Sequence, residues 1–219
     1  MRMVPNKWTK FMVLNRSSDV AVHIPNMKKY SADNLRSMLS SHSFVVVKPM
    51  IGTGGLGVVK VEKLGNGSYR YHHASKNRLV GSFEELDRSL NRIRNGRAYM
   101  IQQGVHLMRI QGRSVDYRVK MIKEKSNWKI TAVVARIARP GLFVTNLCRG
   151  GRMESARSAL SRGFPKKSAH LKKQTMRGVA RTCTKILENE YPGIGALGYD
   201  FGVDRSGRVW ILEVNTRPH

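Results

Sequence analysis

The sequence predicts an α+β protein, because expected strands and helices follow one another in mixed order along the chain. β-Branched runs at residues 44–48 and 58–61 are typical of buried strands, whereas apolar residues repeat at helical spacing over residues 83–93 and 168–190. The chain has 219 residues, of which 41% are hydrophobic, and it contains no internal repeat or long linker. This length suits one domain, or two small lobes that share a core.

The first part of the chain divides near residue 30. Residues 1–30 contain Pro5, Pro25 and mixed polarity, so we expect an extended N-terminal segment there and a single domain over residues 31–219. Ser31 can cap a helix that begins directly after it. The other elements expected before residue 105 are strands at 44–48, 58–61 and 99–103, a hairpin turn at 65–67, and a helix that begins with the capping box Ser82–Glu85.

The second half of the chain predicts longer elements. Two strands at about 115–123 and 128–138 flank a turn at residues 126–127. A long helix is expected at 168–190, with Val179, Cys183, Ile186 and Leu187 facing inward. The chain is expected to end in a hairpin with strands at 196–203 and 208–215 around a turn at 204–207.

Charge is the most unusual feature of the composition. The chain carries 40 Lys and Arg against 14 Asp and Glu, which gives a formal net charge of +26. Residues 155–187 include nine basic residues and no acidic one. Such a stretch is either a solvated face or a surface that binds a polyanion with strongly salt-dependent affinity. The usual signatures of zinc fingers, basic zippers and RNA-recognition domains are missing, so the charge predicts a class of partner without a mode of docking.

Composition also limits the cellular setting. No run of 18 apolar residues exists, so we expect no membrane span, and the basic N-terminus lacks the apolar core of a signal peptide. Two cysteines, Cys148 and Cys183, exclude a disulfide scaffold and a four-cysteine zinc site. We therefore expect a cytoplasmic chain whose two cysteines are packing residues.

A glycine-rich loop follows the strand at 44–48. Gly52, Gly54 and Gly57 match G-x-G-x-x-G, but a strand follows instead of the helix that a dinucleotide fold requires. Val58 stands where a Walker A loop would have lysine, and Lys48 precedes the loop, in contrast to protein kinases. Two interpretations remain open: a lid whose backbone amides approach phosphates beside Lys48, or a plain glycine-rich hairpin.

The C-terminal hairpin contains a second group of candidate residues. Glu213 and Asn215 are two residues apart on one strand, so their side chains share a face. With a turn at 204–207, Asp200 would pair with Ile211 and reach Glu213 diagonally. Carboxylate and amide oxygens are ligands that suit Mg²⁺. The alternative interpretation is that these are exposed polar residues of an ordinary hairpin.

Several motifs in order resemble a known family. They are Asn6–Lys10, Val47–Pro49, the loop Gly52–Gly57, Tyr99–Gln103, Asp116–Arg118, Thr145–Gly151, Asp200 and Glu213–Asn215. Their order is similar to that of the ATP-grasp superfamily, most closely its YheC/YheD group, which is associated with bacterial endospore coats. The ribosomal-protein glutamate ligases are more distant relatives that share two of the motifs. The resemblance covers almost the whole chain.

The resemblance implies an ATP-grasp fold in which two small α+β lobes clasp ATP, and it implies roles for individual residues. Those implied for ATP binding are Lys48, Gly54, Gly55, Gly57, Gln103, Gly104, Val105, Asp116 and Arg118. Those implied near the γ-phosphate and the acyl phosphate, as catalytic residues, are Arg136, Arg139 and Asn146. Those implied as ligands of Mg²⁺ or Mn²⁺ are Asp200, Glu213 and Asn215.

The implied activity is that of a ligase, in which a carboxylate is activated as an acyl phosphate and then attacked by an amine or thiol. Only 47 residues precede Lys48, so the N-terminal domain that usually helps to bind substrate is expected to be lacking, and Gln103 stands where relatives often have Glu. A non-catalytic nucleotide-binding protein of the spore coat and a basic polyanion-binding protein therefore remain alternatives. Expected partners are ATP, an unknown carboxylate and its acceptor, and an acidic protein or the spore coat; nucleic acid is less favoured.

Overall fold

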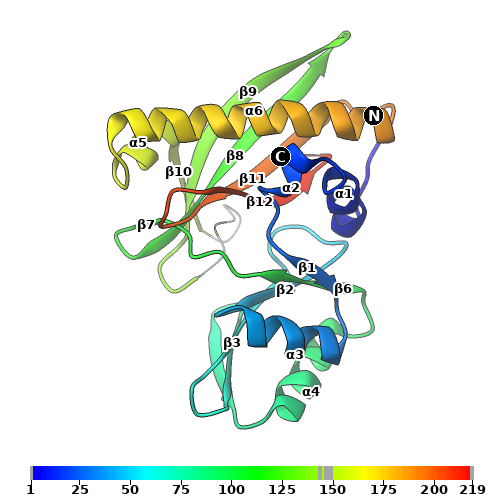
Figure 1. Cartoon of the computed structure of the whole chain (residues 1–219), viewed down its shortest axis with the longest axis vertical. Coiled ribbons are helices and arrows are strands. Elements are labelled where there is room, and N and C mark those ends of the chain that lie inside the picture. Colours follow the sequence, from blue (N-terminus) through cyan, green and yellow to red (C-terminus); the bar gives the residue numbers. More distant parts are fainter. Residues whose placement is uncertain (1, 143–144, 146–149, 218–219) are drawn as a thin grey trace. The chain divides into compact units, whose positions relative to one another are not determined.

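The computed structural model describes residues 2–142, 145 and 150–217. These form two compact units. The middle unit is Pro25–Gly104, and the main unit combines the residues up to Ile24 with those from Val105 onward. Each unit has an antiparallel sheet with helices, which confirms the predicted α+β class (Figure 1).

The middle unit is built on a six-stranded sheet. Its strand order is β1-β6-β2-β3-β4-β5, and every neighbouring pair is antiparallel. The strands are β1 Met27–Lys29, β2 Val45–Pro49, β3 Val59–Lys63, β4 Tyr69–His73, β5 Lys76–Val80 and β6 Tyr99–Gln103, and the helices are α3 Ala32–Ser41 and α4 Phe83–Arg94. The strands and helices predicted for this region are therefore present.

Helices α3 and α4 begin where their caps predict. The Ser31 hydroxyl accepts a hydrogen bond from the backbone N–H of Asn34, and the Ser82 hydroxyl accepts one from that of Glu85. The Glu85 carboxylate accepts a hydrogen bond from the backbone N–H of Gly81, one residue before the cap. These contacts satisfy N–H groups that the first helical turn leaves without partners.

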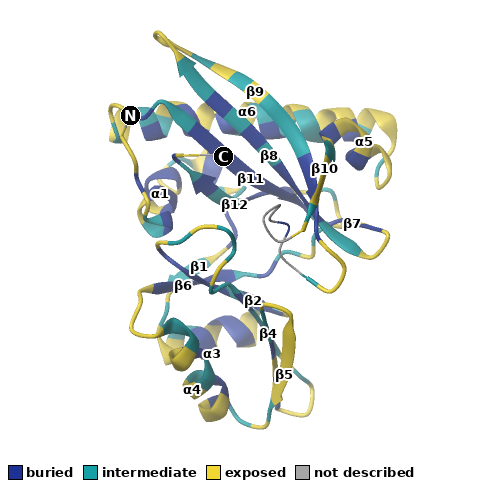
Figure 2. Cartoon of the chain, turned by 180° about the vertical axis from the view of Figure 1, so that it is seen from behind, coloured by how far each residue is buried: buried dark blue, intermediate teal, exposed yellow. Residues whose placement is uncertain are grey.

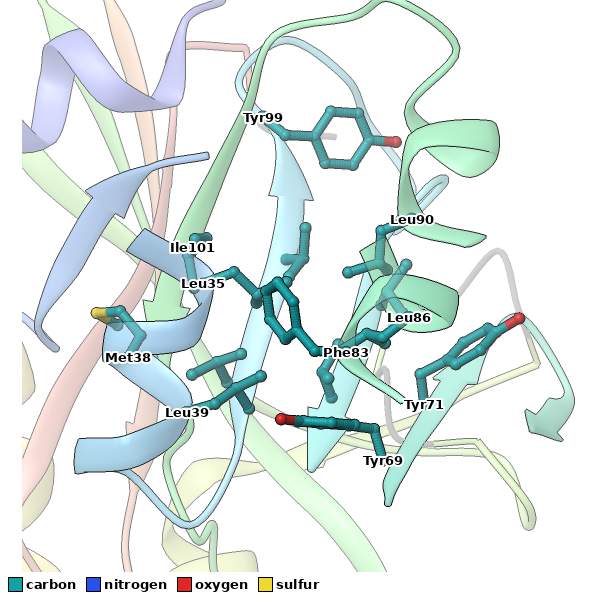
Figure 3. Close-up of a cluster of buried hydrophobic side chains, with 14 residues drawn as sticks. Leu35, Met38, Leu39, Tyr69, Tyr71, Phe83, Leu86, Leu90, Tyr99 and Ile101 are labelled. Carbon is teal, nitrogen blue, oxygen red and sulfur yellow. The ribbon is translucent and has the colours of Figure 1, made fainter. Parts of the chain in front are cut away.

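The core of the middle unit lies between these helices and one face of the sheet. Figure 3 shows Leu35 and Leu39 of α3 and Phe83 and Leu86 of α4 gathered over the strands. Each such side chain contributes roughly 1.5–3 kcal/mol by leaving water. Alternate residues of β2 and β6 point to the opposite face, which therefore carries polar side chains such as that of Lys48.

The main unit has its own antiparallel sheet, with strand order β10-β9-β8-β11-β12 and with β7 paired to β8. Its strands are β7 Arg109–Ile110, β8 Arg113–Glu124, β9 Asn127–Ile137, β10 Arg152–Ser155, β11 Ala196–Val203 and β12 Val209–Asn215. Its helices are α1 Lys7–Leu14, α2 Ser18–Ala21, α5 Ala156–Ser161 and α6 Lys166–Glu190.

Helix α6 lies across one face of this sheet (Figure 1). The hydroxyls of Thr184 on α6 and Tyr199 on β11 are 2.8 Å apart, and both residues are buried. Cys183 is buried beside them, and burial raises the pKa of its thiol to about 12. Cys183 is thus the packing residue that the sequence predicts, because its thiolate is strongly disfavoured. Of the other positions expected to face inward, Leu187 is buried, whereas Val179 and Ile186 are half-buried. Figure 2 shows buried and exposed parts alternating along α6.

The prediction of an extended segment over residues 1–30 is wrong for residues 7–14 and 18–21, which are helical. Asn6 caps α1 by accepting from the backbone N–H of Trp8, and the buried Phe11 and Leu14 follow at helical spacing. Helix α1 packs against α6 and β12. A short helix of this kind is marginal alone, so its stability comes from that packing, which the isolated segment does not reveal.

The C-terminal hairpin forms with a register that differs from the predicted one. Val203 pairs with Val209 rather than Arg208, and the register shifts by one residue between Asp200 and Phe201. Phe201 therefore pairs with Ile211, whereas Asp200 lies directly opposite Glu213. The extra residue of a β-bulge reverses the alternation of side chains, so Ile211 joins the buried core and Glu213 turns to the other face.

None of the helices in the described part of the chain is long and apolar enough to cross a membrane.

Candidate functional site

The face of the main sheet opposite α6 carries a cluster of charged side chains from four neighbouring strands. Strand pairing aligns Arg118 of β8 with Asp200 of β11, and Asp200 with Glu213 of β12. It also aligns Asp116 of β8 with Arg136 of β9. Residues paired across antiparallel strands share a face, so the structure brings these five predicted site residues together.

Asp200 lies at the centre of this cluster. Arg118 donates two hydrogen bonds to its carboxylate, from Nε at 2.7 Å and from an Nη at 2.9 Å. An Nη atom of Arg136 lies 3.0 Å from the second Asp200 oxygen. Such forked contacts are the strong form of the ion pair and fix the orientation of both partners.

Asp116 has a separate set of partners. Arg136 donates to it from Nε at 2.8 Å and from an Nη at 2.5 Å, and the Thr145 hydroxyl donates to it at 2.5 Å. All three residues are buried. The resemblance implies that Asp116 faces the nucleotide. In the structure its carboxylate instead binds Arg136, a predicted catalytic residue, and holds that side chain in place.

Burial and charge oppose each other in this cluster. Burial alone would raise the pKa of Asp200, but Arg136 and Arg118 together lower it below the ordinary value. Burial raises the pKa of Asp116, and Arg136 offsets only part of that increase. The pKa of Arg136 is raised by the two carboxylates despite its burial. Arg136 therefore remains cationic, and Asp200 remains ionised at neutral pH.

Two lysines of α1 that the sequence analysis did not select lie next to Glu213. The Lys7 ammonium is 3.6 Å from a Glu213 oxygen. Lys10 is buried, and its ammonium donates a hydrogen bond to the backbone carbonyl of Val4 at 2.5 Å. A signal was available: Asn6 is a good N-cap, and Lys7 and Lys10 are three residues apart on one side of the helix that it caps.

The oxygen donors of this face suit a hard divalent cation. Asp200 and Glu213 are directly opposed, and Asn215 lies two residues beyond Glu213 on the same face. Within the described residues there is no group of three His, Cys, Asp or Glu side chains that could hold a metal, so the amide of Asn215 has to complete the set. Arg118 already pairs with the Asp200 carboxylate, and Lys7 with the Glu213 carboxylate. A bound cation would therefore share each carboxylate with the basic residue that pairs with it.

Two other predicted residues of the main unit, Arg139 and Val105, are not part of this cluster. Arg139 is exposed beyond the end of β9, and its side chain lies against Gly150. Asn146 and Cys148 lie outside the described residues. Val105, which the resemblance implies for adenine binding, accepts a backbone hydrogen bond from Leu107.

In the middle unit, Lys48 is held by a neighbour on β6. Its ammonium donates to the side-chain oxygen of Gln102 at 2.6 Å, and both residues are buried on the sheet face opposite the helices. Gln102 also donates to the sulfur of Met27. Lys48 was predicted as a site residue from the sequence, but Gln102 was not. Strand alternation alone places the side chains of residues 100 and 102 on the same face of β6.

Gln103 and Gly104 make structural contacts at the end of β6. The backbone N–H of Gln103 donates to the carbonyl of Asn26, and the Gln103 side chain accepts from the N–H of Asn26. The backbone N–H of Gly104 donates to the carbonyl of Phe44. Backbone contacts to an adenine ring would therefore have to use other groups of this segment.

The glycine loop requires glycine for two physical reasons. Gly54, Gly55 and Gly57 have φ of 64°, 70° and 73°, in the left-handed region that other residues rarely adopt. A Cβ at Gly57 would also lie 2.4 Å from the hydroxyl oxygen of Tyr99. The loop thus packs against β6 at Gly57, whereas Thr53 and Leu56 are exposed.

Known proteins match this chain along its length. A family model described as YheC/D-like ATP-grasp matches residues 2–219. The endospore coat-associated protein YheD of Bacillus subtilis (strain 168) is 27% identical over 221 residues, which cover 97% of this chain and 48% of YheD. YheC of the same organism is 25% identical over 222 residues, which cover 99% of this chain and 61% of YheC. The chain therefore spans about half to three fifths of these relatives.

Solved structures support the same fold. An N5-carboxyaminoimidazole synthase from Aspergillus clavatus, in complex with ADP and an aminoimidazole ribonucleotide, matches with a TM-score of 0.62. The match covers 100% of this chain and 46% of the synthase, at 11% sequence identity. This likeness shows the fold, and the family model over residues 2–219 shows that the chain belongs to the YheC/D-like ATP-grasp family.

Proposed function

We propose that the chain is a ligase-like ATP-grasp protein that binds ATP with Mg²⁺. It activates a carboxylate as an acyl phosphate, which an amine or thiol then attacks. Family membership supports the ligase-like class, and one observation carries the residue assignment. Oxygen donors and arginines from four neighbouring strands share a face of the main sheet, with Asp200 directly opposite Glu213.

The proposal gives the charged cluster of the main unit two tasks. Asp200, Glu213 and Asn215 would hold the metal through oxygen atoms. Arg118 and Arg136 would donate to phosphate oxygens, for which the planar guanidinium is well suited. Bound Mg²⁺ would neutralise phosphate charge while the phosphoryl group is transferred. Asp116 and Thr145 would act through Arg136 by fixing its orientation.

The middle unit supplies the remaining assigned residues. Lys48 would contribute a positive charge next to phosphate, and Gln102 would position it. The backbone of the glycine loop would approach phosphate oxygens, since Gly54 and Gly55 have no side chain to prevent it. Arg139 and Asn146 remain assigned to the transferred phosphate only by the family resemblance.

The reaction balances without a further reagent. A carboxylate oxygen of the substrate bonds to the γ-phosphorus of ATP, and ADP leaves. The nitrogen or sulfur of the acceptor then bonds to the acyl carbon, phosphate leaves, and the acceptor loses a proton. Cationic side chains stabilise the charge on the departing phosphates in both steps.

The first test measures binding and turnover separately. ATP with Mg²⁺ should raise the melting temperature, because a ligand of the folded state stabilises it. ADP release with candidate carboxylates and acceptors should then require the metal ligands. The variant Glu213→Gln, Asn215→Ala should lose at least 100-fold in ADP release.

A matched control uses another glutamate of the same unit. Glu188 pairs with Lys123 at 2.5 Å, and both lie outside the charged cluster. The variant Glu188→Gln removes a comparable ion pair and should retain ADP release within about twofold. The proposal fails if millimolar ATP and Mg²⁺ do not shift the melting of a folded sample. Equal ADP release from the double variant and the wild type would overturn the metal assignment.

A second candidate function is nucleotide binding without catalysis, as a structural protein of the spore coat. Its support is that Arg118, Arg136 and Lys7 already neutralise Asp200 and Glu213, which leaves a metal to compete with fixed cations. The relatives YheD and YheC are named endospore coat-associated, and we extend that location to this chain as a proposal. An ATP-dependent thermal shift that Mg²⁺ does not increase, without ADP release for any acceptor, would favour this candidate.

A further inference from the structure

A cavity of about 320 Å³, open to solvent, lies between helices α5 and α6 of the main unit. Figure 1 shows α5 beside the N-terminal end of α6. Cations from both helices line this cavity, and they are Arg157, Lys166, Lys173 and Arg177. No acidic side chain of the described residues lines it.

The charge of this cavity is not compensated nearby. No Asp or Glu among the described residues forms an ion pair with any of the four cations. Glu154, in the strand before α5, pairs with Arg152 and Arg162, neither of which lines the cavity. The two acids of α6 lie in its last turn, where Glu188 pairs with Lys123 and Glu190 with Arg16. Four positive charges therefore converge on one small volume, at a cost in mutual repulsion.

The uncharged polar groups of the cavity can also donate hydrogen bonds. Ser161 offers a hydroxyl, and Gln174 offers an amide N–H group. The Gln174 amide lies 3.4 Å from a ring nitrogen of His170, which also lines the cavity. A lining that is rich in donors and lacks a carboxylate suits a ligand whose surface consists of acceptor oxygens.

The cavity is distinct from the proposed ATP site. Helix α6 covers the apolar face of the main sheet, where Thr184 meets Tyr199. Asp200, Glu213 and their arginines lie on the opposite face of the same sheet. The thickness of the sheet therefore separates the two groups of cations.

We propose that the cavity between α5 and α6 binds a compact oligophosphate anion. Arginine offers a forked pair of donors that matches phosphate oxygens, and lysine adds point charges. A volume near 300 Å³ is at the lower end for small-molecule sites, which suits a ligand of a few phosphate groups. Single-stranded nucleic acid would call for large aromatic platforms on which bases stack, and no Phe, Tyr or Trp among the described residues lines the cavity.

The test uses inorganic tripolyphosphate as the probe and isothermal titration calorimetry as the measurement. Titrations contain EDTA and 150 mM NaCl, because metal ions would complex the probe and low salt would favour diffuse binding. The cavity variant is Arg157→Gln, Lys173→Gln, Arg177→Gln. The control variant is Lys167→Gln, Arg181→Gln, Lys185→Gln. It also loses three positive charges, but from residues of α6 that do not line the cavity.

The wild type should bind tripolyphosphate, and the cavity variant should bind it at least 10-fold more weakly. The control variant should stay within about threefold of the wild type. Both variants should keep the thermal shift with ATP and Mg²⁺, so failure here and failure of the ATP proposal give different results. Circular dichroism establishes that each variant is folded.

Three results would overturn the proposal. Equal losses in both variants would show that the probe responds to overall charge and not to the cavity. A wild-type dissociation constant above 1 mM would exclude an oligophosphate site. Tighter binding of a poly-glutamate peptide than of tripolyphosphate, lost only in the cavity variant, would assign the cavity to an acidic protein partner instead.

Discussion

Lys10 combines deep burial with a positive charge. Its side chain is 2% exposed, and its ammonium bonds to the backbone of Val4. Burial lowers the pKa of Lys10 to about 8, an effect that Glu213 partly offsets and Lys7 reinforces. Because the folded state holds this proton less tightly than the unfolded chain, folding is penalised at every pH at which the lysine is charged.

We predict that stability rises with pH between 8 and 10. In this range the unfolded chain still binds the Lys10 proton and the folded chain loses it, so the free energy of unfolding should increase by up to about 3 kcal/mol. Urea denaturation at unit pH steps, in EDTA, measures the slope. Lys10→Met should remove most of it, and a slope that survives in this variant would contradict the assignment. The range stops at pH 10 because burial raises the pKa of Tyr30 and Tyr199, which reverses the slope above that value.

Gly104 illustrates a different constraint at the scale of one residue. A Cβ at this position would lie 2.2 Å from the ring of Phe44, whereas a Cβ at Gly65 would meet nothing within 4 Å. Gly104→Ala should therefore destabilise the middle unit by about 1–3 kcal/mol through overpacking. Gly65→Ala is the matched control and should change its stability by less than about 0.5 kcal/mol. Hydrogen exchange of the β2 and β6 amides reports on this unit; equal protection in the two variants would refute the steric argument.

Helix α6 is the element whose charges most oppose its own stability. Its first turn contains Lys166 and no acid, and its N-cap, Pro165, makes no side-chain hydrogen bond. Positive charges at a helix N-terminus repel the positive end of the helix dipole. Natural sequences tolerate such local conflict mainly where function requires it, in agreement with an anion-binding role for this end of α6.

We predict that Lys166→Glu stabilises the protein by about 0.3–1 kcal/mol and weakens tripolyphosphate binding. Lys185→Glu changes the net charge equally but lies before the last turn of α6 and outside the cavity, so the difference between the two variants removes the effect of net charge. Urea denaturation and calorimetry measure the two properties. Loss of stability in Lys166→Glu relative to Lys185→Glu would show that the dipole argument does not apply.

In strand β12, one inserted residue determines which side chains face the core and which face the charged cluster. Leu212 is the extra residue of the bulge, and it allows Ile211 to pair with Phe201 while Glu213 pairs with Asp200. Strict alternation would have placed residues 211 and 213 on the same face. The identities of the metal-ligand candidates were predictable from the sequence, but their direct opposition depends on this local irregularity.

The whole molecule carries a net charge of +26, which affects both of its units. Repulsion among so many like charges destabilises the compact state and weakens as salt shortens the screening length. We predict that the melting temperature rises between 0.05 and 0.5 M NaCl. The melting temperature of the cavity variant, which has three fewer positive charges, should rise less over the same range of NaCl. A melting temperature that falls with NaCl would show that attractive pairs such as Arg118–Asp200 outweigh the repulsion.

The sequence predicted best the helices and strands that are favoured by residues close to them in the chain. Ser31 and Ser82 cap their helices, and the β-branched residues of β2 form a buried strand, because neighbouring residues alone favour these structures. Helix α1 was missed for the opposite reason. Its eight residues are too few to be stable alone, and what stabilises them is packing against α6, which begins more than 150 residues later.

The sequence by itself determined the α+β class, the excess of positive charge and the identity of the candidate ligands Asp200, Glu213 and Asn215. Only the tertiary structure decided which cations accompany them. Arg118 and Arg136 reach Asp200 from separate strands, and Lys7 reaches Glu213 from a helix at the other end of the chain. These contacts depend on strand register and helix packing, which join residues up to about 200 positions apart, so the local sequence can indicate a helix or a strand but not its partner.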